Sequence, residues 1–383
     1  MLAPRRRSGW IVTLTLVLAA GAAHAESDRD GSLGFFGDWR ARLESDFDSR
    51  DAGGVEREDR TRIRARVRAG LRYRPSDRLQ FEVRLRSGSD LSQQSAHITL
   101  VDLDDNDTGG ADFNFDRWYV RGTATGERFW GWIGRNGLPF KRSNEMFWDH
   151  DATVVGLAGG FEGTLGDHGR LTLQGGRFSG PAGMRRFSGD IATFQAAFDF
   201  TCAGGGLSAG LGVIATEADA TDPDASVLLE NNGARDYTIG VLSLGGRRSV
   251  RGRPMSAGVD LLHNSEDYSP LDPDPITAAN FDQTDGVVLS WTWGGTKERG
   301  DWLVGYFYAS IEKFAIHNSW AQDDWVRWGS AGQTRASGME GHELRYARGL
   351  GNRQNVTVRL FLVEAIDTIE DGGRLRIDYN GRF

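Results

Sequence analysis

Arginine occupies most of the alternate positions over the stretch Arg60–Ser87, and this pattern is the clearest chemical signal in the sequence. On the strand pattern proposed below, one side of this stretch and of the segment before it carries Arg40, Arg42, Arg62, Arg64, Arg66, Arg68, Arg72, Arg84 and Arg86. A guanidinium group donates two parallel hydrogen bonds to a carboxylate or a phosphate. A row of arginines can therefore raise the local concentration of anions and exclude cations.

Four carboxylates on the same side allow a second interpretation. Asp38, Glu44, Asp46 and Glu82 alternate with apolar residues in the same way as the arginines. They could pair with the arginines in a lattice that only stiffens the wall. The excess of arginine over acid on these segments favours anion handling, and the guanidinium group does not choose between carboxylate and phosphate.

The elements that position these arginines are β-strands. Ile63, Val67 and Leu71 occupy the positions between the arginines, and strict alternation places successive side chains on opposite faces of a strand. The break at Pro75–Asp77 predicts a tight turn, so the stretch forms a hairpin with one apolar and one charged face. Such a sheet belongs either to a soluble protein or to a membrane barrel with a wet lumen.

The first residues favour export. Arg5, Arg6 and Arg7 precede an apolar run that starts at Trp10, and Ala23–Ala25 forms a small-residue cleavage site. This pattern predicts a signal peptide over residues 1–25, with an uncleaved anchor as the alternative. The mature chain, residues 26–383, then has 45 − 3 = 42 basic and 53 acidic residues, a formal charge of −11. Cys202 is the only cysteine, so no intramolecular disulfide is possible.

Alternation recurs along the whole mature chain and predicts about sixteen strands. The expected strands are Phe35–Phe47, Arg60–Arg74, Arg78–Gly88, Phe113–Ala124, Arg128–Arg135, Thr153–Gly163, Gly169–Phe178, Asp190–Phe200, Gly205–Ala215, Arg235–Gly245, Arg253–His263, Thr284–Gly294, Asp301–Glu312, Met339–Arg348, Gln354–Ala365 and Gly373–Phe383. Short connections alternate with mostly long ones, as periplasmic turns and external loops do in outer-membrane barrels. The sequence therefore predicts an all-β, antiparallel up-and-down transmembrane barrel of 16–18 strands with a water-filled lumen.

The last strand and the aromatic residues support this architecture. Leu375, Ile377, Tyr379 and the terminal Phe383 share one face, a pattern similar to the signal that the barrel-assembly machinery recognises. Aromatic residues near the expected strand ends would form interfacial girdles. They are Trp39, Trp118, Trp130, Trp132, Trp291, Trp293, Trp302, Tyr306 and Tyr308.

One long loop, Asn136–Ala152, is rich in apolar and aromatic residues. Such residues are costly in an external loop unless they turn inward, so we expect this loop to fold into the lumen as a constriction. Its candidate residues are Arg135, Asn136, Pro139, Phe140, Trp148, Asp149 and Asp151. Asp149, His150 and Asp151 could also be metal ligands, although a lone histidine between acids more often only forms hydrogen bonds.

The remaining acidic clusters fall in expected external loops. Asp102, Asp104, Asp105 and Asp107 have a spacing that could hold Ca²⁺, but they lack the glycine and glutamate of an EF-hand loop. A solvated acidic loop is the leading interpretation, so we expect no cofactor. The pairs Asp272/Asp274 and Asp323/Asp324 could bridge lipopolysaccharide through divalent ions.

Several of these motifs resemble a known family. The Gly134–Phe140 segment, the Trp148–Asp151 segment, the Arg62–Tyr73 hairpin and the stretch from Tyr306 to Tyr346 are similar to the putative porin family of Gram-negative outer membranes. The resemblance implies a single-chain barrel in the outer membrane and gives no substrate. Similar strand patterns occur in the alginate-export family, whose arginine-lined barrels pass an anionic polysaccharide.

Three functional classes follow. The leading one is an outer-membrane porin, a passive channel for small hydrophilic and anionic solutes. The alternatives are an exporter of an anionic polysaccharide such as alginate, and an adhesin or structural barrel. An enzyme is not expected, because neither His263 with Ser265 nor His342 with Ser337 lies in a nucleophile motif. The expected partners are membrane lipid, lipopolysaccharide, solutes and the assembly machinery. A homotrimer is possible, and no nucleic acid is expected.

Overall fold

The computed structural model describes residues 31–89, 94–104, 109–179, 189–218, 235–325 and 336–383. Its long strands are β1 (Ser32–Arg50), β3 (Arg60–Ser76), β4 (Leu79–Ser87), β6 (Phe113–Thr123), β7 (Phe129–Gly137), β8 (Thr153–Leu165), β9 (Gly169–Ser179), β10 (Gly189–Cys202), β11 (Gly205–Ala218), β12 (Tyr237–Val250), β13 (Arg253–Asn264), β14 (Asp285–Gly294), β15 (Trp302–Ile311), β16 (Met339–Gly351), β17 (Gln354–Ala365) and β18 (Asp371–Arg382). Two short strands, β2 (Glu56–Arg57) and β5 (Ile98–Asp102), and the helix α2 (Pro275–Ala279) lie in long loops.

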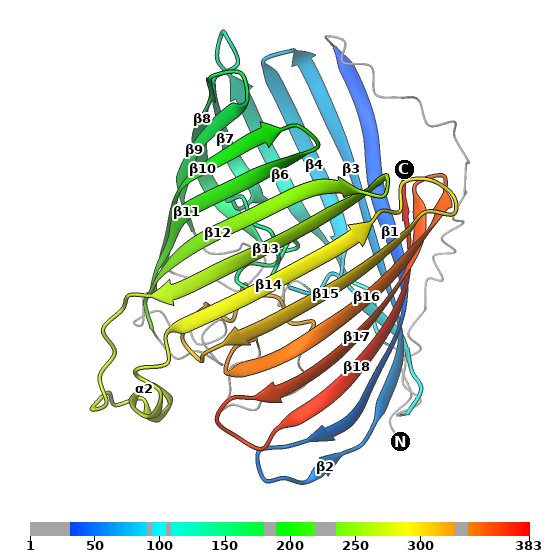
Figure 1. Ribbon diagram of the computed structural model, residues 1–383, viewed down its shortest axis with the longest axis vertical. Coiled ribbons are helices and arrows are strands. Elements are labelled where there is room, and N and C mark those ends of the chain that lie inside the picture. Colours follow the sequence, from blue (N-terminus) through cyan, green and yellow to red (C-terminus); the bar gives the residue numbers. More distant parts are fainter. Residues whose placement is uncertain (1–30, 90–93, 105–108, 180–188, 219–234, 326–335) are drawn as a thin grey trace, which may run out of the picture.

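The long strands form one closed antiparallel barrel. Each pairs with the next along the chain, and β18 returns to β1 through pairs such as Arg42 with Asp378. Figure 1 shows the strands running obliquely around the barrel, with the long loops at the end where α2 and β2 lie. The predicted sixteen-strand up-and-down barrel is confirmed, and the two extra strands are short segments that sequence patterning does not reveal.

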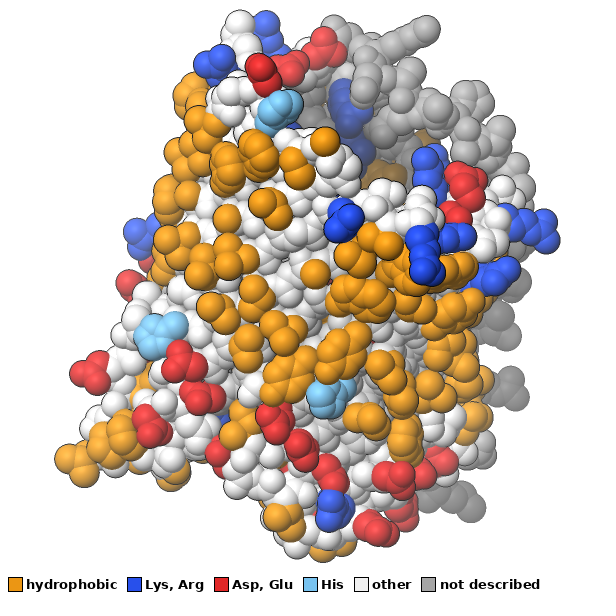
Figure 2. Space-filling model, viewed as in Figure 1, with side chains coloured by type: hydrophobic (Ala, Val, Ile, Leu, Met, Phe, Trp, Pro, Cys, Tyr) orange, Lys and Arg blue, Asp and Glu red, His pale blue; other side chains and the backbone are white. Residues whose placement is uncertain are grey.

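The alternation of the sequence divides the side chains between the outside and the inside of the barrel. Ile63, Val67 and Leu71 are exposed on the outer surface, whereas their neighbours Arg66 and Arg84 are largely buried inside. Figure 2 shows hydrophobic side chains over the middle of the outer surface, with mostly acidic side chains at the long-loop end and both basic and acidic ones at the short-turn end. This is the surface that a barrel in a membrane requires.

The prediction of aromatic girdles is correct for most residues and wrong for two. Trp118 and Trp291 are exposed on the outer surface, but Trp130 and Trp132 point inward. Trp132 is only 6% exposed and stacks on Phe178, with ring centroids 5.6 Å apart. An aromatic side chain points outward or inward according to the strand face that its residue occupies. Closeness to the strand end does not decide this.

The connections follow the predicted division into short turns and long loops. The β12–β13 turn consists of Arg251 and Gly252, both with positive φ, as tight hairpins require. The expected signal peptide, residues 1–25, lies outside the described residues. In the part of the chain that the structure describes, no helix is long and apolar enough to cross a membrane.

Candidate functional site

The structure places the nine arginines of the sequence prediction on the inner face of the barrel. Neighbouring strands align them in rows, with Arg66 beside Arg40 and Arg64 beside Arg42. We call the inner faces of β17, β18, β1, β3 and β4 the arginine wall. Paired strands lie about 4.8 Å apart, so these guanidinium groups lie within reach of one another and of the intervening carboxylates.

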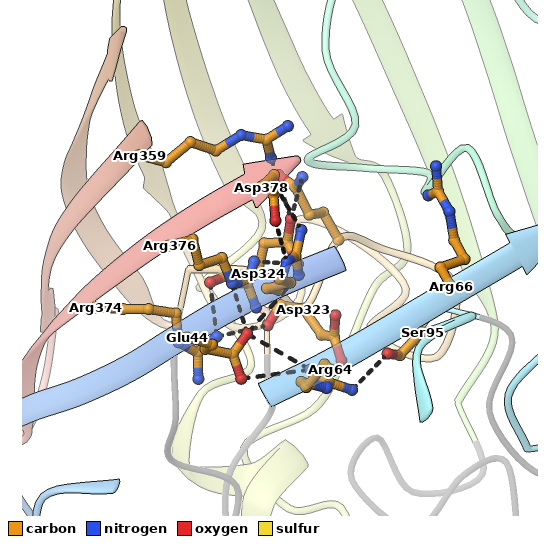
Figure 3. Close-up of polar contacts among 12 residues, drawn as sticks. Glu44, Arg64, Arg66, Ser95, Asp323, Asp324, Arg359, Arg374, Arg376 and Asp378 are labelled. Carbon is orange, nitrogen blue, oxygen red and sulfur yellow. Dashed lines mark hydrogen bonds and ion pairs between the residues drawn. The ribbon is translucent and has the colours of Figure 1, made fainter. Parts of the chain in front are cut away.

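Glu44 is the centre of an ion-pair network in this wall. Its side chain is fully buried and accepts hydrogen bonds from Arg376 Nε at 2.6 Å, from Arg64 Nη1 at 3.3 Å and from Arg62. Figure 3 shows Glu44, Arg64 and Arg376 converging from β1, β3 and β18. A carboxylate surrounded in this way is held rigidly, because each arginine orders its neighbours.

Other carboxylates extend the network along the wall. Arg42 binds Asp378 with Nε at 2.6 Å, and Arg84 binds Asp116 with Nε at 3.0 Å. Asp38 accepts from both Arg66 and Arg68, at 2.9 and 2.8 Å. Much of the arginine charge is therefore balanced within the wall, as the lattice interpretation predicts.

The loop of residues 138–152, between β7 and β8, lies inside the barrel. Its backbone N–H at Lys141 donates to Gln195 on β10 at 2.7 Å, and Ser143 and Asn144 bond to Asp260 on β13. At its other end Asp151 pairs with Arg66, at 3.4 Å, and with Arg68. The loop thus connects β10 and β13 with the arginine wall.

Most of the loop residues that the sequence analysis singled out are buried inside the barrel, and two lie in a strand. Pro139, Phe140, Trp148, Asp149 and Asp151 are buried. Arg135 and Asn136 are the wrong members of the set, because they lie in β7.

Arg135 does not face the path that it was expected to narrow. Its guanidinium group is 5% exposed and donates to Thr153 Oγ1 at 2.9 Å and to the Phe115 carbonyl at 2.7 Å. It ties the two ends of the loop to the adjacent strand.

A second inward segment, residues 312–325, follows β15 and was missed by the sequence reasoning. Phe314, Ile316 and Trp320 are fully buried in it. Trp320 packs on Trp148 with ring centroids 5.2 Å apart, and its carbonyl accepts from the Asp149 N–H at 2.7 Å. The sequence contained a signal for this inward path, because apolar residues exposed outside the barrel are as costly in residues 312–325 as in residues 138–152.

Asp324 lies at the inner end of this segment, and its assignment to an external loop is wrong. Its carboxylate pairs with Arg376, with Arg359 at 3.5 Å and with Arg42 at 3.8 Å. Its carbonyl accepts from Arg374 at 2.7 Å. The cluster of inward arginines attracts this carboxylate across the lumen, which no local sequence pattern reports.

A third segment, residues 94–97, reaches the same region. Gln94 donates to the carbonyl of Ala321 at 2.7 Å, and Ser95 accepts from Arg64 at 3.0 Å. The inward segments therefore contact one another as well as the arginine wall.

The carboxylates in the two longer loop segments have opposite electrostatic surroundings. Burial alone would raise the pKa of Asp324, but the charges of Arg376, Arg42 and Arg359 outweigh it and hold the pKa well below its usual value. For Asp149, burial and the nearby charges of Glu145 and Asp151 together raise the pKa well above its usual value. Burial lowers the pKa of His317 to about 3, so its ring is neutral at physiological pH.

Two of the four residues considered as weak calcium ligands are engaged with protein groups. Asp102 binds Arg60 Nε at 2.6 Å, and Asp104 accepts from the Thr61 N–H. Asp105 and Asp107 lie outside the described residues. Among the residues that the structure describes, no three His, Cys, Asp or Glu side chains are grouped to hold a metal.

The remaining acidic and histidine candidates also have partners. Asp274 caps α2 and pairs with Arg235, while His150 pairs with Glu145. His263 bonds to Asp285 at 2.8 Å and His342 to Tyr306 at 2.9 Å, whereas Ser337 donates to the Lys313 carbonyl. The histidine–serine pairs considered for an enzyme therefore bond to other groups.

The inner faces of β10–β14 differ from the arginine wall. We call this region the small-residue wall, defined by its inward residues Ala197, Gly210, Gly212, Ser243, Gly245, Ser256, Gly258, Ser290 and Thr292. Phe140 of the inward loop packs on it, and a Cβ atom at Gly212 would lie 2.5 Å from the Phe140 ring. The absence of a side chain at Gly212 makes room for the loop.

A cavity of about 240 Å³ lies beside the arginine wall towards the short-turn end of the barrel. Seven arginines and one carboxylate, Asp38, contribute to its lining; the arginines are Arg40, Arg66, Arg68, Arg345, Arg353, Arg359 and Arg382. A second cavity of about 430 Å³ borders the small-residue wall, and Arg345 lines both.

Comparison with known proteins confirms the resemblance inferred from the sequence. Residues 35–184 match the model of the family described as "Putative porin". No curated protein matches the sequence. The relation to the alginate-export family stays a prediction.

Solved structures show that the fold is that of outer-membrane porins. The chain is similar to the high-pH structure of OprB from Pseudomonas putida, with a TM-score of 0.59 and 11% identity over 92% of this chain and 94% of that one. It is also similar to the outer-membrane channel DcaP of Acinetobacter baumannii (0.53, 12%, 92% and 98%) and to an anion-selective porin from Comamonas acidovorans (0.51, 12%, 92% and 100%).

Proposed function

We propose that this porin-like barrel is a passive channel of a Gram-negative outer membrane, which conducts small hydrophilic solutes and prefers anions. The observation that carries the preference is the cavity beside the arginine wall, whose lining includes seven arginines and one carboxylate, Asp38. Guanidinium groups in a partly desolvated passage attract anions and repel cations.

The ion-pair network explains why the preference arises at the short-turn half of the barrel. Towards the long-loop end, Glu44, Asp46 and Asp378 balance their arginine neighbours at close range. Asp151 and Asp324 bring two more carboxylates to the wall from the inward loops. Asp151 and Asp324 reach Arg66, Arg68 and Arg359 of the cavity lining, but arginines still outnumber carboxylates there.

The inward segments support a constriction. Residues 138–152 contact both walls. Residues 312–325 pack against this loop, because Trp320 contacts Trp148. These segments narrow the lumen, which favours small solutes over a polysaccharide. They are also the reason to expect a substrate-preferring channel instead of a wide pore.

The membrane setting follows from the same proposal. The outer surface contacts lipid, external acidic loops contact lipopolysaccharide, and the strand ending at Phe383 addresses the assembly machinery after signal cleavage near Ala25. A trimer remains a prediction, as does the absence of enzymatic activity, which is inferred from the family and fold.

The test is the reversal potential of the refolded mature protein in a planar bilayer under a KCl gradient. Chloride should be more permeant than potassium, and Arg40→Gln should reduce the ratio about threefold. One unit charge at about 7 Å in water is worth about 0.6 kcal/mol, which corresponds to that factor.

Arg248→Gln is the matched control, because it removes the same charge from an exposed residue on the outer face. Its permeability ratio should equal that of the unaltered protein. A preference for potassium would refute the anion proposal and show that the carboxylates set the field. The lack of any steady current would favour an adhesin or a closed exporter.

A further inference from the structure

The two cavities share Arg345, and we treat them together as one chemically asymmetric groove along the inner wall. One register row crosses it, from Ser256 through Thr292 and Gly305 to Arg345 and Arg359. The groove therefore passes from hydroxyl groups to guanidinium groups within a few strands.

Two arginines at this end of the groove, Arg40 and Arg359, are only loosely paired with carboxylates. Arg40 Nη1 lies 3.9 Å from Asp378, and Arg359 lies 3.5 Å from Asp324 and 4.0 Å from Glu343. In the tight pairs of the same wall the corresponding distances are about 2.6 Å. Loosely paired guanidinium groups beside a cavity are the ones that an incoming anion can engage at the lowest electrostatic cost.

Arg345 is held firmly at the junction of the two cavities. Its Nε donates to Glu343 at 2.6 Å, and its guanidinium group lies over the Phe307 ring at 4.3 Å. Its side chain retains 26% exposure. A positioned and partly exposed guanidinium group can hold an anion in a fixed place.

Hydroxyl groups line the other end. Ser208, Ser256, Ser290 and Thr292 border the larger cavity, beside Arg247 and the Lys141–Asp199 ion pair. A Cβ atom built on Gly305 would lie 3.4 Å from both Thr292 Cγ2 and Arg345 Cβ, so the hydroxyl-bearing and cationic side chains flank the same glycine. A solute of a few carbon atoms can reach both.

From this juxtaposition we infer that the groove is a binding subsite for a polyhydroxylated anion, a sugar acid or a sugar phosphate. The anionic group binds Arg345, Arg359 and Arg40, and the hydroxyl groups bind the serine and threonine side chains. The inference rests on the proposed channel function and adds the chemical class of its preferred solute.

The experiment measures the block of chloride current by probes that separate the two features. Gluconate and hexanoate both carry six carbons and one carboxylate, whereas glucose carries hydroxyl groups and no charge. Gluconate should half-block the current at a concentration at least roughly tenfold below those of hexanoate and glucose, since it alone uses both ends of the groove. Glucose 6-phosphate distinguishes a phosphate from a carboxylate preference.

Two variants locate the block in the groove. Arg345→Gln should raise the half-blocking concentration of gluconate roughly tenfold, while Arg117→Gln, which removes an arginine of β6 outside the groove, should leave it unchanged. Ser290→Ala with Thr292→Val should bring gluconate towards hexanoate without altering chloride preference. This double variant keeps every ion pair, so it tests the inference even where Arg345→Gln fails to fold.

The outcomes separate the inference from the proposed function. Equal block by gluconate and hexanoate, with chloride still preferred over potassium, would overturn the subsite and leave the channel in place. A gluconate block that survives the double variant would also overturn it. Loss of chloride preference in the unaltered protein would instead refute the function.

Discussion

The two sides of the barrel interior are filled by different kinds of side chain. The arginine wall is filled by long charged side chains joined in ion pairs, as at Glu44 and Asp378. The small-residue wall has mostly short side chains, and the inward loop packs on it through Phe140 and bonds to Gln195 and Asp260. One wall is organised by charge and the other by short side chains.

The loop of residues 138–152 makes this difference functional, because it contacts both walls. Its apolar part packs on Gly212, whereas its final carboxylate, Asp151, pairs with Arg66 and Arg68. The position of the loop therefore depends on two independent kinds of contact. Substitutions on either wall can be used to separate them.

The largest expected effect is at the centre of the arginine wall. Glu44→Gln leaves Arg62, Arg64 and Arg376 beside a buried neutral group, and removing one partner of a buried ion pair costs about 3–5 kcal/mol. The midpoint of urea unfolding of the barrel in detergent micelles, followed by its gel mobility, should fall accordingly.

Asp260→Asn is the counterpart on the other side. Asp260 is equally buried, but its partners Ser143 and Asn144 are uncharged, and an asparagine oxygen still accepts hydrogen bonds from them. We expect a loss of at most about 1 kcal/mol. Equal losses for the two variants would mean that charge does not organise the arginine wall.

The next effect tests the small-residue wall. In Gly212→Ala the new Cβ would lie 2.5 Å from the Phe140 ring and 2.9 Å from the Phe194 carbonyl. Overpacking of this kind costs about 1–3 kcal/mol, and the same unfolding assay measures it.

Gly210→Ala, two residues earlier on the same face, is the control. Its nearest neighbours would be the Gln195 amide at 3.5 Å and Ser243 Cβ at 3.8 Å, which are ordinary contacts. Stability should therefore change little. If both variants behave alike, Gly212 is not a seat for the loop.

The strands and their facing could be predicted because both follow from local periodicity. Successive side chains of β3 alternate between the outer and the inner face of the barrel, so Ile63 and Arg64 point to opposite sides. The inward path of residues 138–152 was also predictable, since Trp148 and Phe147 are too apolar for an external loop. The sequence analysis predicted neither the inward path of residues 312–325 nor the inward orientation of Trp132.

The pairing of the arginines was not predictable in detail. Asp324 binds Arg42, Arg359 and Arg376, which are 282, 35 and 52 positions away in the sequence. Such contacts depend on how the barrel closes and how the loops cross it. The lattice interpretation of the arginine wall is realised near Glu44, and the pair at Arg40 is looser. Anion handling stays a prediction.

A smaller effect is expected from Asp324, where charge and loop position meet. Asp324→Asn removes one negative charge from the wall, so the permeability ratio of chloride to potassium should rise about threefold, the factor for one unit charge at about 7 Å in water. The reversal potential under a KCl gradient measures it.

Asp285→Asn provides the control for that measurement, because it removes the same charge from the exposed outer rim. Its ratio should stay unchanged. An unaltered or lower ratio in Asp324→Asn would show that the carboxylate does not face the ion path.

The smallest expected effect is on the pH dependence of stability, and it distinguishes two carboxylates of the inward loop, Asp149 and Asp151. Burial, Glu145 and Asp151 raise the folded pKa of Asp149 well above its unfolded value near 3.8, so between these two values the folded state binds more protons than the unfolded state. Asp149 therefore lowers stability as pH rises. Asp149→Asn, whose side-chain oxygen can still accept from the Asp151 N–H, should be more stable than the unaltered protein at pH 8 and similar to it at pH 4.

Asp151 should show the opposite sign. Burial would raise its pKa, but Arg68, Arg66 and Arg86 outweigh burial and lower it, so its stabilising contribution is present above the unfolded pKa and is lost only as pH falls through the lower folded value. Asp151→Asn should therefore be less stable than the unaltered protein at pH 8, and the deficit should persist at pH 5. Urea midpoints at these pH values test both residues. If both variants shift in the same direction at pH 8, contact with the arginine wall does not distinguish the two carboxylates.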